Sequence, residues 1–395
     1  MNIAKSSKFN IKIDYEKSHD AFVFDKNTNK YYLDFFGMYA SLPLGYNHEI
    51  FKTEDFINEM NRVVAVKVNN CEFVSDESLE FDKKFTSFCG KGVFKHFHYS
   101  CTGALAIEAA IKTCIEYMNH KKPKILSFHN SFHGINSYGG FVTSRFPGAD
   151  KRLDGFPEVF SVKVDCELDS VEEALKNQDI TCVLVEPIQC SAGDIHHDLL
   201  FFSGLRKLCD LYDVPLVFDE IQTGFGATGK LWYYEHTDIV PDIVVFGKKT
   251  QLSGIMVQDK FDNIFKPGKA IRLEVTWDGD VVDMVRCKYI MKAYEENDIL
   301  QNAHKVGNII AEGLKNINGI ENVRHIGLLI GFDLKDQEGR DKIVKSLFQK
   351  RLICNSTGER SIRLRPNLNL RIEDANLGLA IIKEAVEKGE GEDGT

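Results

Sequence analysis

Through the middle of the chain, short apolar runs alternate with longer segments whose apolar residues recur at the helical period. The apolar runs, each of which predicts a buried strand, occupy residues 93–99, 124–128, 180–186, 215–218 and 242–246. The helical segments between them include residues 104–118, 170–176 and 199–212. Repeated alternation of strand and helix is typical of a mostly parallel sheet flanked by helices, so we expect an α/β fold.

The two ends of the chain differ from this middle part. Residues 21–25 and 31–36 flank a polar turn, which predicts a hairpin. After residue 280 the chain becomes more helical, and it closes with short strands expected near residues 327–334 and 361–364. We therefore expect three parts: an N-terminal segment (1–50) that joins the small domain, a large domain (51–280), and a smaller α+β domain (281–390).

Composition narrows the class of protein. With 395 residues and 43% apolar residues, the chain can bury a large core and is long enough for two domains. Its formal charge of -9 argues against sequence-independent binding of nucleic acid. No apolar run approaches membrane-spanning length, and no secretory signal is visible at the start. The 10 cysteines form no C-x-x-C pair, which predicts free thiols in a reducing cytoplasm and no metal site.

In a parallel sheet, ligands collect where the strands end, so the residues after each apolar run are the candidate site. One such segment, Gly224–Lys230 (GFGATGK), resembles most of a phosphate-binding P-loop. A P-loop needs Ser or Thr after its lysine to hold magnesium, and here Leu231 follows. Acidic residues also stand between the strand and the first glycine, where they would repel a triphosphate. We interpret the glycines as a flexible turn.

Other strand-end residues together meet the needs of pyridoxal phosphate. Lys248 would emerge from a buried strand, where desolvation favours the free amine that forms a Schiff base. Asp219 could keep the pyridine nitrogen protonated, and Gly103 and Ala104 open a helix whose N–H groups would hold the phosphate. Phe132 could cover the ring. Taken singly, these are commonly a loop lysine, a turn aspartate and a core phenylalanine; their joint order is far more specific.

The chain resembles the class III aminotransferases, dimeric enzymes of fold type I that use pyridoxal phosphate. The resemblance covers about residues 20–370, and several segments match lysine 6-aminotransferases in particular. The segments that carry it are Thr102–Lys112, Ser131–Gly134, Val185–Pro187, Phe218–Gly226, Pro241–Lys248, Thr276-Trp277 and Ile362–Pro366.

The resemblance implies a role for individual residues. Lys248, rather than its neighbour Lys249, should form the Schiff base and move the proton between the α-carbon and the cofactor. Gln222 should contact the phenolic oxygen of the cofactor. Thr276 should reach the phosphate from the other subunit of a homodimer, so that the active site lies at the interface. Arg363 should bind a substrate carboxylate, for which a guanidinium is well shaped.

Two positions depart from the lysine 6-aminotransferases. These enzymes carry an arginine, which reads the distal carboxylate of lysine, where this chain has Ile135. They also carry a glutamate where this chain has Ser191. In the family that glutamate masks the arginine at the position of Arg363 while the amine donor is bound. Neutral drift with compensation elsewhere is the plainer reading; we favour a changed substrate.

We therefore expect an aminotransferase that moves an amino group between an amine or amino acid donor and an α-keto acid such as 2-oxoglutarate. The alternative on the same scaffold is a racemase, epimerase or decarboxylase acting on an α-amino acid held by Arg363. Need for a keto-acid acceptor distinguishes the two. A catalytically inactive binding protein is disfavoured because Lys248 and Asp219 are both present.

Overall fold

A seven-stranded sheet forms the centre of the computed structural model, which describes residues 9–68, 73–145, 160–177, 179–266 and 270–391. The strand order is β3-β11-β10-β9-β6-β4-β5. The sheet contains β3 (His96–Ser100), β4 (Lys124–Phe128), β5 (Ser161–Val164), β6 (Ile180–Val185), β9 (Leu216–Asp219), β10 (Ile243–Phe246) and β11 (Ser253–Val257). All neighbouring pairs from β5 to β10 are parallel, and only β11 runs against its neighbours. The expected, mostly parallel sheet is confirmed.

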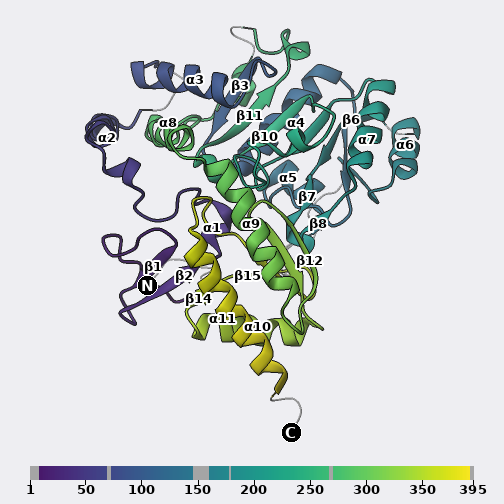
Figure 1. Ribbon diagram of the computed structural model, residues 1–395. Helices are drawn as coiled ribbons and strands as arrows, with labels where there is room; N and C mark the ends of the chain where they lie inside the picture. Colours follow the sequence, from purple (N-terminus) through teal and green to yellow (C-terminus); the bar gives the residue numbers. More distant parts are fainter. Residues whose placement is uncertain (1–8, 69–72, 146–159, 178, 267–269, 392–395) are drawn as a thin grey trace.

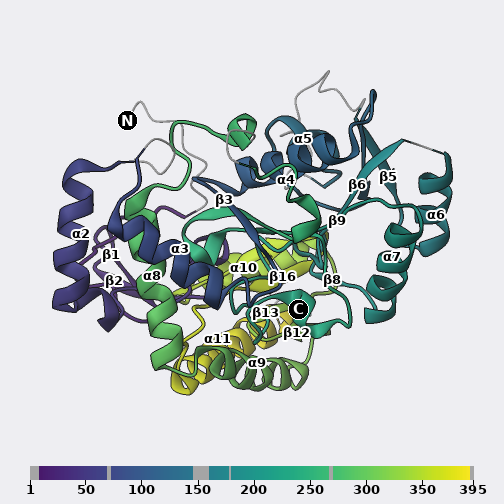
Figure 2. The same ribbon diagram turned by 90° about the horizontal axis from the view of Figure 1, so that it is seen from above.

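Helices cover both faces of this sheet. The side chains of each strand point alternately to the two faces, and apolar side chains on both faces are buried under helices. Val217 and Val245 point to the cluster that contains α4 (Gly103–Met118). Phe218 and Phe246 point the other way, where they meet rings from α7 (Leu199–Leu211) and α3 (Asp76–Phe88) at centroid distances of 5.4 Å and 5.0 Å. In Figure 2, α4 and α5 (Ser137–Val142) lie on one side of the sheet.

A second body of structure, below the sheet in Figure 1, joins the two ends of the chain. Its antiparallel sheet has the order β12-β13-β16-β15 and packs with α9, α10 and α11. The hairpin β1–β2 pairs with β14 through the parallel partners Leu33 and Leu352, which places β2 beside a strand of the C-terminal part. The remaining strands are β1 (Phe22–Asp25), β2 (Lys30–Asp34), β7 (Ile188–Gln189), β8 (Ile195–His196), β12 (Glu321–Ile326), β13 (Leu329–Asp333), β14 (Leu352–Ile353), β15 (Asn355–Thr357) and β16 (Ser361–Leu364).

Helix α8 links the two bodies. It packs against α2 and α3, and the rings of Phe56 and Tyr289 meet edge to face at 5.1 Å. It is assigned by sequence to the small domain, and the domain limits stay a prediction. The remaining helices are α1 (Gly37–Ala40), α2 (Glu54–Val66), α6 (Leu168–Asn177), α8 (Val281–Glu296), α9 (Ile299–Lys315), α10 (Gln337–Gln349) and α11 (Ile372–Gly391). No helix in the described ranges is both long and apolar enough to cross a membrane.

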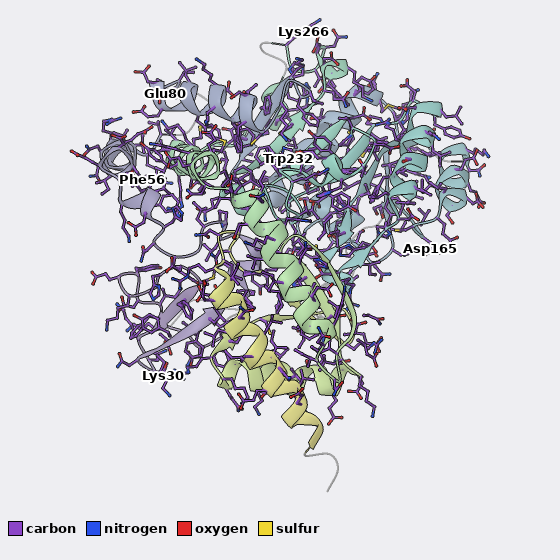
Figure 3. The ribbon with its side chains drawn as sticks, in the orientation of Figure 1. Lys30, Phe56, Glu80, Asp165, Trp232 and Lys266 are labelled. Carbon is purple, nitrogen blue, oxygen red and sulfur yellow. The ribbon has the colours of Figure 1, made fainter. Side chains whose placement is uncertain are left out.

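The glycine segment 224–230 is a buried turn rather than a phosphate loop. A Cβ on Gly224 would lie 2.5 Å from the ring of Trp232, so only glycine allows this close approach. Trp232, labelled in Figure 3, is fully buried in the middle of the molecule. Lys230 is exposed, and its ammonium donates to the backbone oxygen of Glu235. The interpretation as a turn holds, but the turn is tightly packed, whereas we expected a flexible one.

Candidate functional site

A cavity of about 450 Å³ opens at the carboxyl ends of the parallel strands. Residues that follow five different strands line it, among them Gly103, Phe132, Glu186, Asp219 and Lys248. Sequence reasoning placed these residues at strand ends, and the topology brings them to one edge of the sheet. The size suits a small organic ligand, since such pockets commonly span ~300–1,000 Å³.

The N-terminus of α4 forms one wall of the cavity. Thr102 is the N-cap residue but makes no side-chain cap, and no acidic residue stands in the first turn. The backbone oxygen of Thr102 accepts from the N–H groups of Leu105 and Ala106. The N–H groups of Gly103 and Ala104 have no such intrahelical partner, as at any helix start, so they can bind an anion.

Lys248 enters the cavity from a strained backbone. Its φ of 53° lies in the left-handed region, which is uncommon for a residue with a side chain. Burial, reinforced by the charge of Arg363, lowers the pKa of the Lys248 ammonium below its ordinary value. A lowered pKa leaves more free amine at neutral pH, which is the form that attacks a carbonyl carbon.

The neighbouring Lys249 is buried on the other side of this turn and is not among the residues that line the cavity. Its ammonium has no hydrogen-bond partner among the described residues. Burial, together with the charges of Arg365 and Lys248, lowers the pKa of Lys249 to about 7. Of these two lysines, only Lys248 lines the cavity, as its predicted role requires.

Asp219 is buried and oriented by a histidine. Its Oδ2 lies 2.8 Å from Nδ1 of His133, and its Oδ1 accepts from the N–H of Ile221 at 3.1 Å. Both His133 and Asp219 line the cavity. Sequence reasoning named Asp219 but missed His133, although it stands in the quoted segment Ser131–Gly134. Its position next to Phe132 was the available signal.

Glu186 holds the backbone of Phe132, the residue predicted to cover the ring. Its Oε1 accepts from the backbone N–H of Phe132 at 2.6 Å, which holds that phenylalanine at the cavity wall. Burial and the nearby charge of Asp219 raise the pKa of Glu186 well above its ordinary range. Glu186 stands in the segment Val185–Pro187, one of those that carry the family resemblance.

Gln222 lines the cavity beside Asp219, and an arginine holds its side-chain oxygen. Nε of Arg365 donates to Oε1 of Gln222 at 3.2 Å. The guanidinium of Arg365 also pairs with the carboxylate of Asp194, and both residues are buried. Sequence reasoning missed Arg365 and Asp194, because their ion pair joins two residues that are 171 positions apart in the chain.

Arg363 is buried close to this group but makes a different contact. Its Nη1 donates to the backbone oxygen of Cys190 at 2.9 Å, next to Ser191. No carboxylate lies within ion-pair distance of Arg363 among the described residues. Burial, and then the charge of Arg365, lowers the pKa of Arg363. The loop that carries Ser191 therefore holds this guanidinium through backbone oxygen only.

Four predicted residues are not among those that line the cavity of the single chain: Ile135, Ser191, Thr276 and Arg363. Two of these, Ile135 and Thr276, are also exposed. Ile135 is 58% exposed and follows Gly134, which does line the cavity. Thr276 is exposed, next to the half-exposed Trp277. The roles assigned to these four residues therefore stay predictions.

The residues present fit pyridoxal phosphate. The uncapped helix start provides N–H donors for a phosphate, Asp219 provides an oriented carboxylate, and Lys248 provides an amine of lowered pKa. Phe132 and Ile221, which also line the cavity, provide apolar surface for a flat ring. Each requirement is met by a different strand end.

Comparison with known proteins gives consistent matches. The family described as "Aminotransferase class-III" matches residues 3–386. The L-lysine-epsilon aminotransferase of Mycobacterium tuberculosis is 30% identical over 413 residues, covering 95% of this chain and 92% of that protein. The 4-aminobutyrate aminotransferase of Dictyostelium discoideum is 29% identical, over 90% of this chain and 81% of that one.

Solved structures match over nearly the whole chain as well. A lysine aminotransferase from M. tuberculosis superposes with a TM-score of 0.88 at 27% identity, covering 98% of this chain and 97% of that one. The ornithine aminotransferase of Toxoplasma gondii has a TM-score of 0.87 at 21% identity and covers 99% and 94%. The second likeness concerns the fold alone.

Proposed function

The chain belongs to the class III aminotransferases, a pyridoxal phosphate-dependent family of fold type I, and from that premise we propose that its substrate pair differs from that of the lysine 6-aminotransferases. One substrate is an α-amino or α-keto acid whose carboxylate is bound by Arg363. The other is a less anionic amine, ketone or aldehyde. The observation that carries this proposal is that Arg363 has no carboxylate partner among the described residues, with Ser191 where the relatives' glutamate would stand.

When bound, pyridoxal phosphate supplies an aldehyde for the substrate amine and an electron-withdrawing ring. The free amine of Lys248 accepts and returns the proton of the reacting carbon, since its pKa is lowered by burial. The carboxylate of Asp219, oriented by His133, holds a proton on the ring nitrogen. The N–H groups of Gly103 and Ala104 bind the phosphate, and Gln222 contacts the phenolic oxygen.

The absence of an acid beside Arg363 changes how the two substrates alternate. In the lysine 6-aminotransferases, a glutamate neutralises the arginine at the position of Arg363 while the bound donor offers that arginine no carboxylate. Ser191 carries no charge, so Arg363 stays open to a carboxylate in both half-reactions. Among the described residues, the buried guanidinium of Arg363 has one hydrogen-bond acceptor, the backbone oxygen of Cys190. Its remaining N–H groups can bind a ligand, and a carboxylate is the group that best satisfies them.

Ile135 supports the second half of the proposal. An isoleucine cannot pair with the distal carboxylate that the relatives' arginine reads, so it favours a partner substrate with an apolar or uncharged end. In one chain Ile135 is exposed, as are Thr276 and Trp277. A homodimer would cover such residues and bring Thr276 to the partner's phosphate site. The described cysteines are free thiols, which supports a reducing compartment such as the cytoplasm.

A panel of amino donors tests this proposal. The purified holoenzyme is mixed with each donor without an acceptor, and the loss of its visible absorbance band is followed, with products identified by mass. We expect other α-amino acids, and weakly charged amines, to convert the holoenzyme faster than lysine does. Rapid conversion by lysine with formation of its 6-semialdehyde would contradict the proposal while leaving the enzyme class intact.

A further inference from the structure

The contact between Arg365 and Gln222 sets the orientation of the glutamine amide. A guanidinium only donates hydrogen bonds, so the atom that accepts from Nε of Arg365 at 3.2 Å must be the side-chain oxygen of Gln222. The amide nitrogen of Gln222 is then the other branch, and it has no bonded acceptor among the described residues. Because Gln222 lines the cavity, this nitrogen is an available donor at the cavity wall.

Arg365 itself is held by contacts on both sides. Its side chain pairs with Asp194 and donates from Nη1 to the backbone oxygens of Ile330 and Leu364 at 3.2 Å and 2.9 Å. The residue is 3% exposed, and its N–H donates to the backbone oxygen of Phe35 at 2.7 Å. A guanidinium anchored by so many contacts has one accessible position, so its Nε is a fixed donor.

The anchor also requires a close approach between strand and loop. A Cβ on Gly331, in β13, would lie 2.9 Å from Oδ2 of Asp194. Asp194 has a φ of 55° in the loop before β8. Glycine at 331 and the left-handed turn at 194 together bring the carboxylate to Arg365. The Arg365–Asp194 pair thus connects the antiparallel sheet to the loop that follows β7.

We propose that Arg365 is a positioning residue, which holds the oxygen of Gln222 so that the amide nitrogen faces the phenolic oxygen of pyridoxal phosphate. This inference rests on the role proposed above for Gln222. Without Arg365 the amide could turn over and present its oxygen, which repels a phenolate. Strand β16 and the residue directly after it would then supply two arginines with separate tasks: Arg363 for the substrate carboxylate, and Arg365 for the amide that contacts the cofactor.

The test is a pH titration of the visible absorbance band of the holoenzyme. A hydrogen bond to the phenolate favours the deprotonated form of the bound chromophore, so its loss raises the pKa of the band. We expect Gln222→Leu and Arg365→Met each to raise this pKa by about one unit, a ~10-fold change in proton affinity. In the double variant the two shifts should not add, because Arg365 acts through Gln222.

Removing a nearby cation can also raise the pKa of the band, and Arg363→Met provides the matched control. Arg363 lies two residues before Arg365, within β16. It is also buried and contacts the same loop, but it has no hydrogen bond to Gln222 among the described residues. Its effect should be the same with Gln222 or Leu at position 222. If Arg365→Met also shifts the band equally in both backgrounds, it acts only through its charge, and the proposal is wrong.

Further outcomes separate the inference from its premise. If Gln222→Leu leaves the band unchanged, the role of Gln222 fails, and the inference fails with it. If Gln222→Leu shifts the band while Arg365→Met does not, only the inference is overturned. Should Arg365→Met not fold, Arg365→Lys keeps a positive charge beside Asp194 and Lys249. It should still shift the band, and an unchanged band in a folded Arg365→Lys would overturn the proposal.

Discussion

The cofactor wall of the cavity and the residues proposed to bind the substrates, the substrate side, are built in different ways. The cofactor wall, defined by Gly103, Ala104, Phe132, Asp219 and Lys248, comes from the ends of parallel strands within one sheet. The substrate side, defined by Ile135, Ser191, Thr276 and Arg363, comes from loops, from the antiparallel sheet and from exposed positions. Only the first group lines the cavity of the single chain. Chemistry shared with a family can therefore persist on the first while the second changes.

The sharpest challenge to this division is Lys248→Ala. The variant removes the amine that we propose reacts with the cofactor aldehyde and moves the proton, so turnover should fall by on the order of 10³-fold or more. Borohydride reduction of the wild-type holoenzyme should leave the cofactor covalently attached, as mass spectrometry of the intact protein can detect. The Lys248→Ala variant should retain no attached cofactor after the same treatment. Attachment that persists in this variant would place the reactive amine elsewhere.

Asp219→Asn tests the cofactor wall at a second point. The amide cannot hold a proton on the ring nitrogen, so turnover should fall by on the order of 10²–10³-fold while the fold is kept. The variant is nearly the same size and can still accept from the N–H of Ile221. Steady-state kinetics measure the loss, and circular dichroism checks the fold. Nearly unchanged turnover would mean that another group protonates the ring.

The contrast also explains what the sequence could predict. The expected helices at 104–118 and 199–212 match α4 and α7 within one residue at each end, because each segment is a long run rich in apolar residues and free of proline. Strand β11 was not anticipated: its segment Ser253–Val257 is short and contains Gly254. In the fold that glycine lets the strand approach β3, where a Cβ would lie 2.2 Å from the backbone oxygen of His98. A requirement of this kind depends on a partner strand more than 150 residues away.

The candidate site divides in the same way. Lys248, Asp219 and Gly103 could be named because each stands within a few residues of the end of an apolar run, which is a local signal. His133, Arg365 and Asp194 could not, because their roles follow from contacts across the fold, such as the 2.8 Å approach of His133 to Asp219. The expected start of the first strand at residue 93 was wrong. Val93 lies in a turn, in which its N–H donates to the backbone oxygen of Gly90, and the strand starts only at His96.

Ser191→Glu tests the substrate side, and its effect should be smaller. A glutamate at this position could pair with Arg363 and cover it until a dicarboxylate arrives. We expect the specificity constant for a donor that uses Arg363 to fall by about 10-fold relative to that for 2-oxoglutarate, since one added interaction discriminates by this order. Ser191→Gln is the matched control, because it adds the same bulk without the charge. If Ser191→Glu affects all substrates equally, the residue at position 191 does not control the access of carboxylates to Arg363.

The smallest expected effect concerns Lys249, which lies against the cofactor wall without lining it. Folding lowers its pKa from 10.5 to about 7, so between these pH values the unfolded chain holds more protons and stability rises with pH. Lys249→Met removes a buried amine that has no partner among the described residues. It should therefore stabilise the protein by ~1 kcal/mol or more near pH 7, and this advantage should shrink toward pH 10. Denaturation midpoints across this range measure the difference, with Lys207→Met, an exposed lysine on α7, as the control.

Because Lys248 remains, borohydride should still attach the cofactor in Lys249→Met. A variant that is less stable at pH 7, or that no longer retains cofactor, would show that Lys249 is part of the cofactor wall.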